Sequence, residues 1–182
     1  YVRDESSGAV IANTPSSDFP LIRLEKDWLL VEPSADTFYR YNSEHVMTPF
    51  IARTPPVRSM TPEVFLLPSV ITDRYYFMDA VKKEWNFETH DGFPRTLLVY
   101  DRVEGAIYES VVYNGDYSGK EKTPLYSKPM SEDIAFSGLL EAGELVEDYN
   151  EGRLKGRLAE IAAELDEESN PVVMFVKHRR AS

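Results

Sequence analysis

Three histidines are the side chains of this sequence that titrate near neutral pH, so they are the first candidates for acid–base or metal chemistry. His45, His90 and His178 lie too far apart in the sequence to form a His-x-x-x-His ligand pair. We expect them to lie on the surface, in turns or at the chain end. His90 has carboxylate residues on both sides, Glu88 and Asp91, and we retain it as a candidate ligand-binding residue.

Aromatic side chains accompany His90. Trp85 and Phe87 alternate with charged and amide residues, where a loop built only for structure would gain little from two large rings. Aromatic faces suit sugar rings and peptide side chains. We therefore predict a ligand site at Trp85, Phe87 and His90, for a glycan or a peptide. The alternative is that both rings pack into the core of a sheet.

No catalytic or metal-binding pattern accompanies this candidate site. Residues 114–119 offer oxygen ligands but lack the spacing and the distal Glu of a calcium loop, so a plain turn is favoured. Acidic residues at 144–148 and 167–168 fit solvated charge better than a glycosidase pair. The sequence has no Gly-x-Ser-x-Gly elbow, no phosphate-binding loop and no Cys. We predict no catalytic residue, no metal and no cofactor, and leave open whether the protein is an enzyme.

The acidic composition limits the partners. The net charge of the 182 residues is −11, which argues against nucleic acid, because phosphate binding depends on clustered Lys and Arg. A hydrophobic content of 42% is enough to bury a core. No run approaches the roughly 18 apolar residues of a membrane span. The chain opens at Tyr1 and not at Met, which implies trimming and leaves room for a signal or lipid-anchor segment before it.

The first 54 residues have the pattern of a four-stranded antiparallel unit. Short runs rich in Val, Ile, Leu and aromatic residues occur at 21–24, 28–32, 37–41 and 46–52. Charged residues, Pro, Ser and Asn separate these runs, as expected for turns. The pattern predicts a meander over residues 1–54.

Residues 55–113 repeat this pattern after a Pro-rich crossing segment. Candidate strands occur at 64–67, 74–79, 95–101 and 106–113, with a hairpin turn at 101–105. Residues 114–133 are polar and rich in Gly and Pro, which predicts a long surface loop.

The end of the chain combines a helix with an apolar strand in an incomplete third unit, residues 131–177. One apolar stripe predicts an amphipathic helix at about residues 150–166, and its members are Leu154, Leu158, Ile161 and Leu165. Residues 134–136 and 139–149 are further strand candidates, although 139–147 could instead begin the helix. The run at 171–177 predicts a strand buried on both faces, because five consecutive apolar residues make a poor surface strand.

Repeated four-stranded units of about 50 residues have the period of β-propeller blades. We therefore predict a mostly β fold, with four-stranded antiparallel blades and one amphipathic helix near the C-terminus, before the last strand. A β-sandwich or barrel with one added helix is the alternative on pattern alone. Residues 1–182 are then a single domain or a fragment of one.

Three segments carry a resemblance to a known family. They read Asp-Thr-Phe-Tyr-Arg-Tyr at 36–41, Leu-Val-Tyr-Asp-Arg-Val-Glu-Gly at 98–105 and, most specifically, a helix end, Asn-Pro and an apolar strand at 165–177. They resemble uncharacterised bacterial six-bladed β-propeller proteins of the Bacteroidetes type. The resemblance covers most of residues 20–177 and implies an exported protein of the periplasm or cell surface, often lipid-anchored. It carries over no catalytic residue.

The length implies a partial ring. Six blades need about twice the 182 residues present, so the resemblance implies the C-terminal portion of a propeller. Two or three blades leave an open edge, and we expect missing blades or a second copy of the chain to cover it. We predict a non-catalytic binding or scaffold module of the bacterial cell envelope. The alternative is a propeller hydrolase or lyase whose site, at the central channel, is shared with the missing blades.

Overall fold

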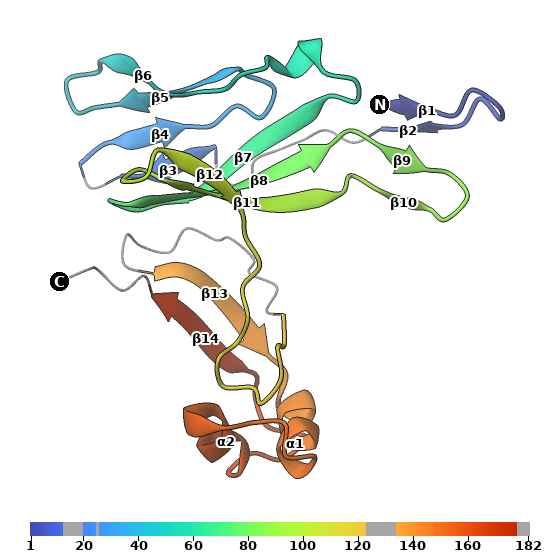
Figure 1. Cartoon of the computed structure of the whole chain (residues 1–182), viewed down its shortest axis with the longest axis vertical. Helices are drawn as coiled ribbons and strands as arrows, with labels where there is room; N and C mark the ends of the chain where they lie inside the picture. Colours follow the sequence, from blue (N-terminus) through green and yellow to red (C-terminus); the bar gives the residue numbers. More distant parts are fainter. Residues whose placement is uncertain (13–19, 25, 123–133, 178–182) are drawn as a thin grey trace. The chain divides into compact units, whose positions relative to one another are not determined.

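The computed structural model describes residues 1–12, 20–24, 26–122 and 134–177 (Figure 1). They belong to two compact units, an N-terminal unit, Tyr1–Ser110, and a C-terminal unit, Val111–Ser182. Most of the regular structure is antiparallel β-sheet, and two short helices lie near the C-terminus. The prediction of a mostly β chain with four-stranded antiparallel sheets is therefore confirmed.

The first sheet of the N-terminal unit contains four strands in chain order. They are β3 (Leu21–Arg23), β4 (Trp28–Leu30), β5 (Thr37–Tyr41) and β6 (Met47–Ala52). Ile22, Leu29 and Phe38 are buried, whereas the residues beside them in each strand are more exposed, because successive side chains of a strand point to opposite faces. The strands predicted within residues 1–54 are confirmed, with small differences at their ends.

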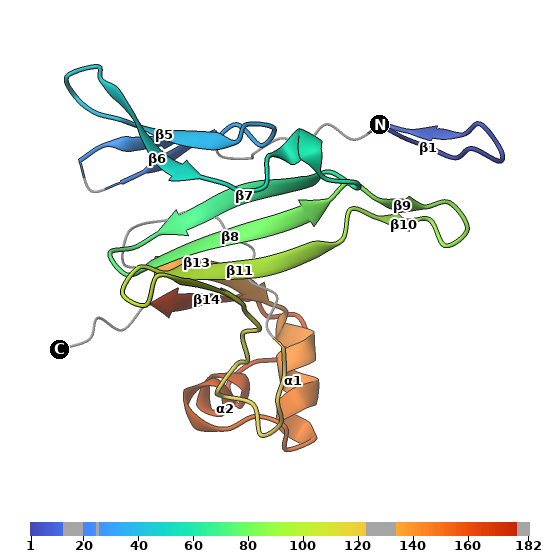
Figure 2. The same cartoon turned by 45° about the horizontal axis from the view of Figure 1, so that its top comes forward.

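The second sheet repeats the meander in the order β12-β11-β8-β7 (Figure 2). Its strands are β7 (Val64–Ile71), β8 (Tyr75–Lys82), β11 (Arg95–Asp101) and β12 (Ala106–Glu109). β7 continues to Ile71, past its predicted end at Leu67, although Pro68 cannot donate a hydrogen bond to the sheet. β7 is an edge strand with a register shift between Pro68 and Val70, and strands tolerate proline in such places.

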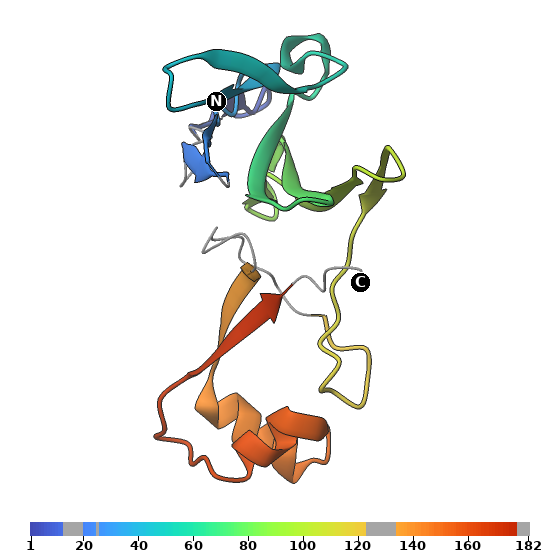
Figure 3. The same cartoon turned by 90° about the vertical axis from the view of Figure 1, so that its left-hand side faces the viewer.

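One apolar cluster joins the two sheets, which Figure 3 shows as two layers. Ile22, Leu29 and Phe38 of the first sheet pack with Ile71 and Met78 of the second. Burial of each large apolar side chain contributes about 1.5 to 3 kcal/mol. This cluster is the main core of the N-terminal unit, and it forms because alternate residues of both meanders face the same layer.

Smaller elements complete the N-terminal unit. β1 (Val2–Arg3) pairs with β2 (Val10–Ile11), and β9 (Trp85–Asn86) pairs with β10 (Asp91–Gly92) in a hairpin that extends between β8 and β11. A 3-10 turn, η1 (Val57–Ser59), connects β6 to β7. Val57 packs in a second apolar cluster with Phe65 and Val81.

The C-terminal unit contains two helices where the sequence pattern predicted one. They are α1 (Ala142–Asn150) and α2 (Gly156–Ala162), so the single helix expected at about residues 150–166 is wrong. Gly152 ends α1 with a φ of 70°. Its N–H bonds to the carbonyl of Tyr149, and the N–H of Arg153 bonds to that of Asp148, which are the two hydrogen bonds of a Schellman motif. The apolar spacing of the sequence continues through this break, so the spacing alone did not show that the first helix ends there.

The predicted apolar stripe still faces the interior of the C-terminal unit. Leu154 and Leu158 are buried with Leu145 of α1 and Ala162, and Ile161 and Leu165 are partly buried. Leu154 lies between the helices and forms a β-bridge with Tyr117. The stripe therefore packs, although it spans a turn as well as a helix.

The terminal strand, β14 (Val172–Lys177), pairs antiparallel with β13 (Ile134–Leu140). Val172 packs against the helices, but Val173 is 53% exposed and Phe175 49% exposed. The expectation that both faces are buried is therefore wrong. β14 and β13 form a two-stranded sheet, and the helices pack against only one of its faces.

A partly buried ion pair fixes one end of the second sheet. Arg74 donates to Asp101, with Nη2 2.7 Å from Oδ2 and Nε 3.0 Å from the same oxygen. Oδ1 of Asp101 accepts the backbone N–H groups of Val103 and Glu104, which closes the turn between β11 and β12. The hydrogen bonds from Arg74 are the main reason that the pKa of Asp101 lies below its ordinary value.

Acid should weaken the N-terminal unit through Asp101. Because its folded pKa is below the ordinary 3.8, the carboxylate contributes its full stability above that pH, and the contribution is lost as the pH falls from 3.8 through the folded pKa. We predict that Asp101→Asn removes this part of the pH dependence of the urea midpoint, because Asn does not titrate. Asp73→Asn, at an exposed position near the same end of the sheet, should keep it. Parallel curves for wild type and Asp101→Asn would contradict the assignment.

Candidate functional site

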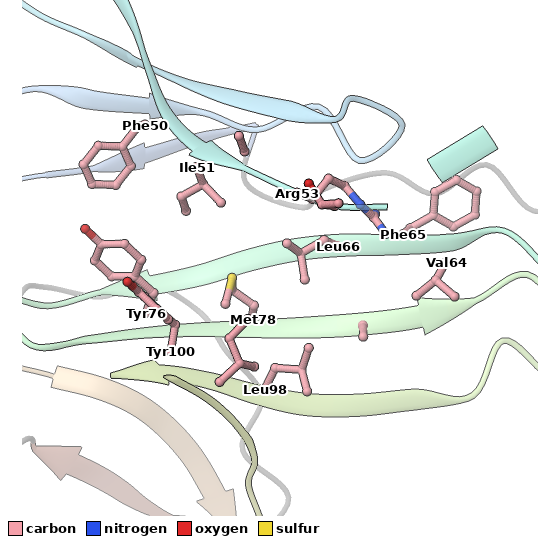
Figure 4. A pocket seen from close by; sticks show the side chains of 14 residues that line it. Phe50, Ile51, Arg53, Val64, Phe65, Leu66, Tyr76, Met78, Leu98 and Tyr100 are labelled. Atoms are coloured by element: carbon pink, nitrogen blue, oxygen red, sulfur yellow. The ribbon is translucent and has the colours of Figure 1, made fainter. Parts of the chain in front are cut away.

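A pocket of about 450 Å³ opens between the two sheets of the N-terminal unit (Figure 4). Its lining is mainly aliphatic and aromatic. The lining residues are Phe50, Ile51, Ala52, Arg53, Thr54, Val64, Phe65, Leu66, Tyr76, Met78, Ala80, Leu98, Tyr100 and Ile107. We call this space the inter-sheet pocket.

Strand register determines the wall that the second sheet supplies. Leu66 pairs with Ala80, Met78 with Leu98 and Tyr76 with Tyr100 across neighbouring strands. Paired residues of antiparallel strands project from the same face, so these six side chains form one continuous wall. The opposite wall comes from the end of β6 and the residues that follow it.

Aromatic rings close one end of the inter-sheet pocket. The ring centroids of Phe50 and Tyr76 are 5.5 Å apart, and those of Tyr76 and Tyr100 are 5.6 Å apart, with tilted planes. These separations are favourable for aromatic pairs. Burial raises the pKa of Tyr76 above its ordinary value of 10.0, and its protonated hydroxyl can donate a hydrogen bond at neutral pH. Phe50 is on the first sheet and Tyr76 on the second, so their contact also spans the two layers.

Arg53 is the one charged side chain among the described lining residues. Its Nε and Nη1 atoms are buried, and neither has a hydrogen-bond partner in the described part of the chain. Nη2 lies 3.9 Å from the Sδ of Met60, a weak acceptor. Burial lowers the pKa of the guanidinium, and the charge of Asp36 opposes this shift. Arg53 remains cationic in water and cannot act as a base, so it can bind an anion but not transfer a proton.

The sequence pattern does not reveal this site. Arg53 follows an apolar strand and precedes Thr54 and two prolines, a context typical of a strand end. The pocket depends on the separation of the two sheets, and no local sequence pattern reports this separation. The alternation of Tyr76, Met78 and Ala80 is the available signal, since apolar residues at alternate positions indicate that one face of a strand is covered.

The predicted ligand residues lie together in the β9–β10 hairpin. Trp85 is partly buried, and its ring packs against Phe93 with a centroid separation of 5.8 Å. It also covers Gly92, where an added Cβ would collide with the ring. Phe87 is partly buried, and His90 is exposed in the turn with a φ of 59°. Trp85 and Phe87 are therefore less exposed than expected for two aromatic rings on the surface of a loop. Ligand binding at these residues stays a prediction.

Two of the remaining polar candidates, His45 and Asp148, make contacts within the protein. His45 is exposed in a turn and bonds to the hydroxyl of Tyr41, and His178 lies outside the described residues. Asp148 forms an ion pair with Arg153 at 2.7 Å and accepts the hydroxyl of Tyr117. Among the residues that the structure describes, no group of three or more His, Asp or Glu side chains is placed to hold a metal ion. None of the helices in the same part of the chain is long and apolar enough to cross a membrane.

No protein-family model matches the chain, and no curated protein matches its sequence. The fold is similar to the crystal structure of a "putative exported protein" from Bacteroides fragilis, with a TM-score of 0.55 and 14% sequence identity. The similarity covers 88% of this chain and 49% of the other, so the chain spans about half the length of that protein. At this identity, the similarity establishes the fold alone.

The hairpin prediction is tested best in a protein with a single tryptophan. Trp28→Phe leaves Trp85 as the only source of tryptophan fluorescence. If the hairpin binds a glycan or a peptide, one member of a ligand panel should quench this fluorescence saturably. Phe87→Ala should then weaken binding about ten-fold, the scale of an aromatic contact in a binding site. An inert panel, or quenching that Phe87→Ala leaves unchanged, would leave both rings with a packing role only.

Proposed function

We propose that this chain is a non-catalytic binding module whose ligand enters the inter-sheet pocket. The observation that carries the proposal is an apolar space of about 450 Å³ with one cation in its wall. Ligand pockets of proteins typically measure about 300 to 1,000 Å³ and combine apolar walls with a few polar groups that orient the ligand. Arg53, Tyr76 and Tyr100 supply such groups here.

The binding module belongs, in this proposal, to a β-propeller of the bacterial cell envelope. The two stacked four-stranded meanders have the strand order of consecutive blades, which supports this architecture. The similar Bacteroides fragilis protein is about twice as long, which fits a chain that supplies part of a ring. Further blades or a second copy of the chain would cover the open edge.

Export to the periplasm or cell surface, with a lipid anchor outside this chain, is the location we propose. The name of the Bacteroides fragilis protein and the resemblance to envelope propellers both favour it. In such a location the β9–β10 hairpin would offer a second contact surface for a glycan or a peptide. Trp85 and Phe87 would then act independently of the inter-sheet pocket.

A neutral apolar dye tests the inter-sheet pocket. N-phenyl-1-naphthylamine carries no charge and fluoresces more strongly in apolar surroundings, so its binding depends on the apolar walls. We predict saturable binding at one site. Ala80→Leu should weaken it about ten-fold or more, because the added carbon atoms take space that the dye occupies, and overpacking of an occupied apolar site costs about 1 to 3 kcal/mol.

Ala106→Leu is the matched control. Ala106 is partly buried on β12 and pairs with Asp101, whose side chain lies on the face of the sheet opposite to Tyr76 and Tyr100. This variant should bind the dye like wild type. Absence of saturable binding, or equal affinities of Ala80→Leu and wild type, would refute the proposed site.

A further inference from the structure

The guanidinium of Arg53 has two donors, Nε and Nη1, without a hydrogen-bond partner in the described residues. The backbone N–H of Arg53 bonds to the carbonyl of Asp36 at 3.0 Å, so Asp36 lies beside it. The carboxylate of Asp36, however, accepts the N–H of Val57 at 2.7 Å and makes no hydrogen bond to the guanidinium in the described residues. A buried donor without a partner is unfavourable, because it loses its hydrogen bonds to water. Arg53 thus keeps unpaired donors although the carboxylate of Asp36 lies nearby.

The guanidinium is oriented for a planar anion. An arginine offers two edges to a carboxylate, one formed by Nε and Nη2 and the other by Nη1 and Nη2. Each edge of Arg53 contains one nitrogen without a partner, and Nη2 has only the thioether of Met60 nearby. In Figure 4 the side chain extends toward Phe65, within the space between the sheets. Nε and Nη1 are buried, so a carboxylate oxygen reaches them only when the side chain turns toward the pocket, and either edge could then receive two carboxylate oxygens.

The other lining residues determine what accompanies that carboxylate. Leu66, Met78 and Leu98 line the wall of the second sheet, and they favour an aliphatic or aromatic body. Arg53 is the one charged residue of the described lining, and Asp36 adds negative charge close to it. Because Asp36 already offsets part of the charge of Arg53, a monoanion suits this site better than a phosphate dianion, which would add more negative charge than one cation can offset.

From these observations we propose that the inter-sheet pocket binds a small monocarboxylate with an apolar body, whose carboxylate pairs with Arg53. This inference rests on the proposed function, since it assigns the ligand class of the same pocket. The volume of about 450 Å³ suits a small molecule. The apolar body lies against the wall that contains Met78 and Leu98, and the acid group reaches the end of β6.

Displacement of the neutral dye from the full chain tests the charge preference. Octanoate, octanamide and octylammonium share one alkyl chain and differ in the head group. We predict that octanoate displaces the dye at a concentration about ten-fold or more below that of octanamide, because hydrogen bonds between charged groups are roughly twice as strong as neutral ones. Octylammonium should be the weakest competitor. This comparison uses the wild-type chain and needs no variant.

Arg53→Met tests the effect of the charge apart from that of the aliphatic part of the side chain. Met keeps an unbranched apolar chain, so the dye and octanamide should bind as in wild type, while octanoate falls to the level of octanamide. The melting temperature should stay equal or rise, because the variant removes an unpaired buried cation. Arg58→Met, at an exposed position outside the pocket lining, should keep the preference for octanoate.

The outcomes distinguish the inference from the proposed function. Dye binding with equal displacement by octanoate and octanamide would overturn the inference and leave the inter-sheet pocket as a binding site. A parallel loss of dye, octanamide and octanoate in Arg53→Met would also overturn it, because Arg53 would then shape the pocket. Absence of dye binding by wild type would overturn the proposed function and the inference together.

Discussion

The contact between two four-stranded sheets is the interaction on which the N-terminal unit depends. Short strands bury little area singly, and the three-residue strands β3 and β4 would be unstable alone. Packing of Ile22, Leu29 and Phe38 against Met78 and its neighbours gives both sheets a covered face. Each meander therefore supplies half of one core, and neither half is complete without the other.

The inter-sheet pocket follows from the same contact. The face of β8 that supplies Met78 to the core also supplies Ala80 to the pocket, where the short side chain of Ala80 leaves room. Arg53 enters this space because it directly follows β6, the last strand of the first sheet. A binding site between sheets thus requires no special loop. It requires only that the apolar core between the two sheets does not extend as far as the ends of the sheets.

Sequence patterns predicted the strands well where alternation and turn residues agreed. The runs at 37–41 and 95–101 coincide with β5 and β11. The second half of β7 could not be predicted, because it contains Pro68. A strand tolerates proline at the edge of a sheet, and the sequence alone does not show which strand lies at the edge. Continuous apolar spacing hid the Schellman turn at Gly152. The pocket and the unpaired state of Arg53 could not be predicted, because both depend on contacts between residues distant in the sequence.

A double-mutant cycle across the layers tests the stacking of the two sheets most directly. Phe50 of β6 and Tyr76 of β8 meet at 5.5 Å, and no strand pairing joins them. The free energy of unfolding would be measured in urea for Phe50→Leu, Tyr76→Leu and the double variant. Stacked sheets predict a coupling energy of about 0.5 to 1.5 kcal/mol between the rings. Additive effects, within about 0.3 kcal/mol, would show that the two sheets do not meet there and would contradict the account.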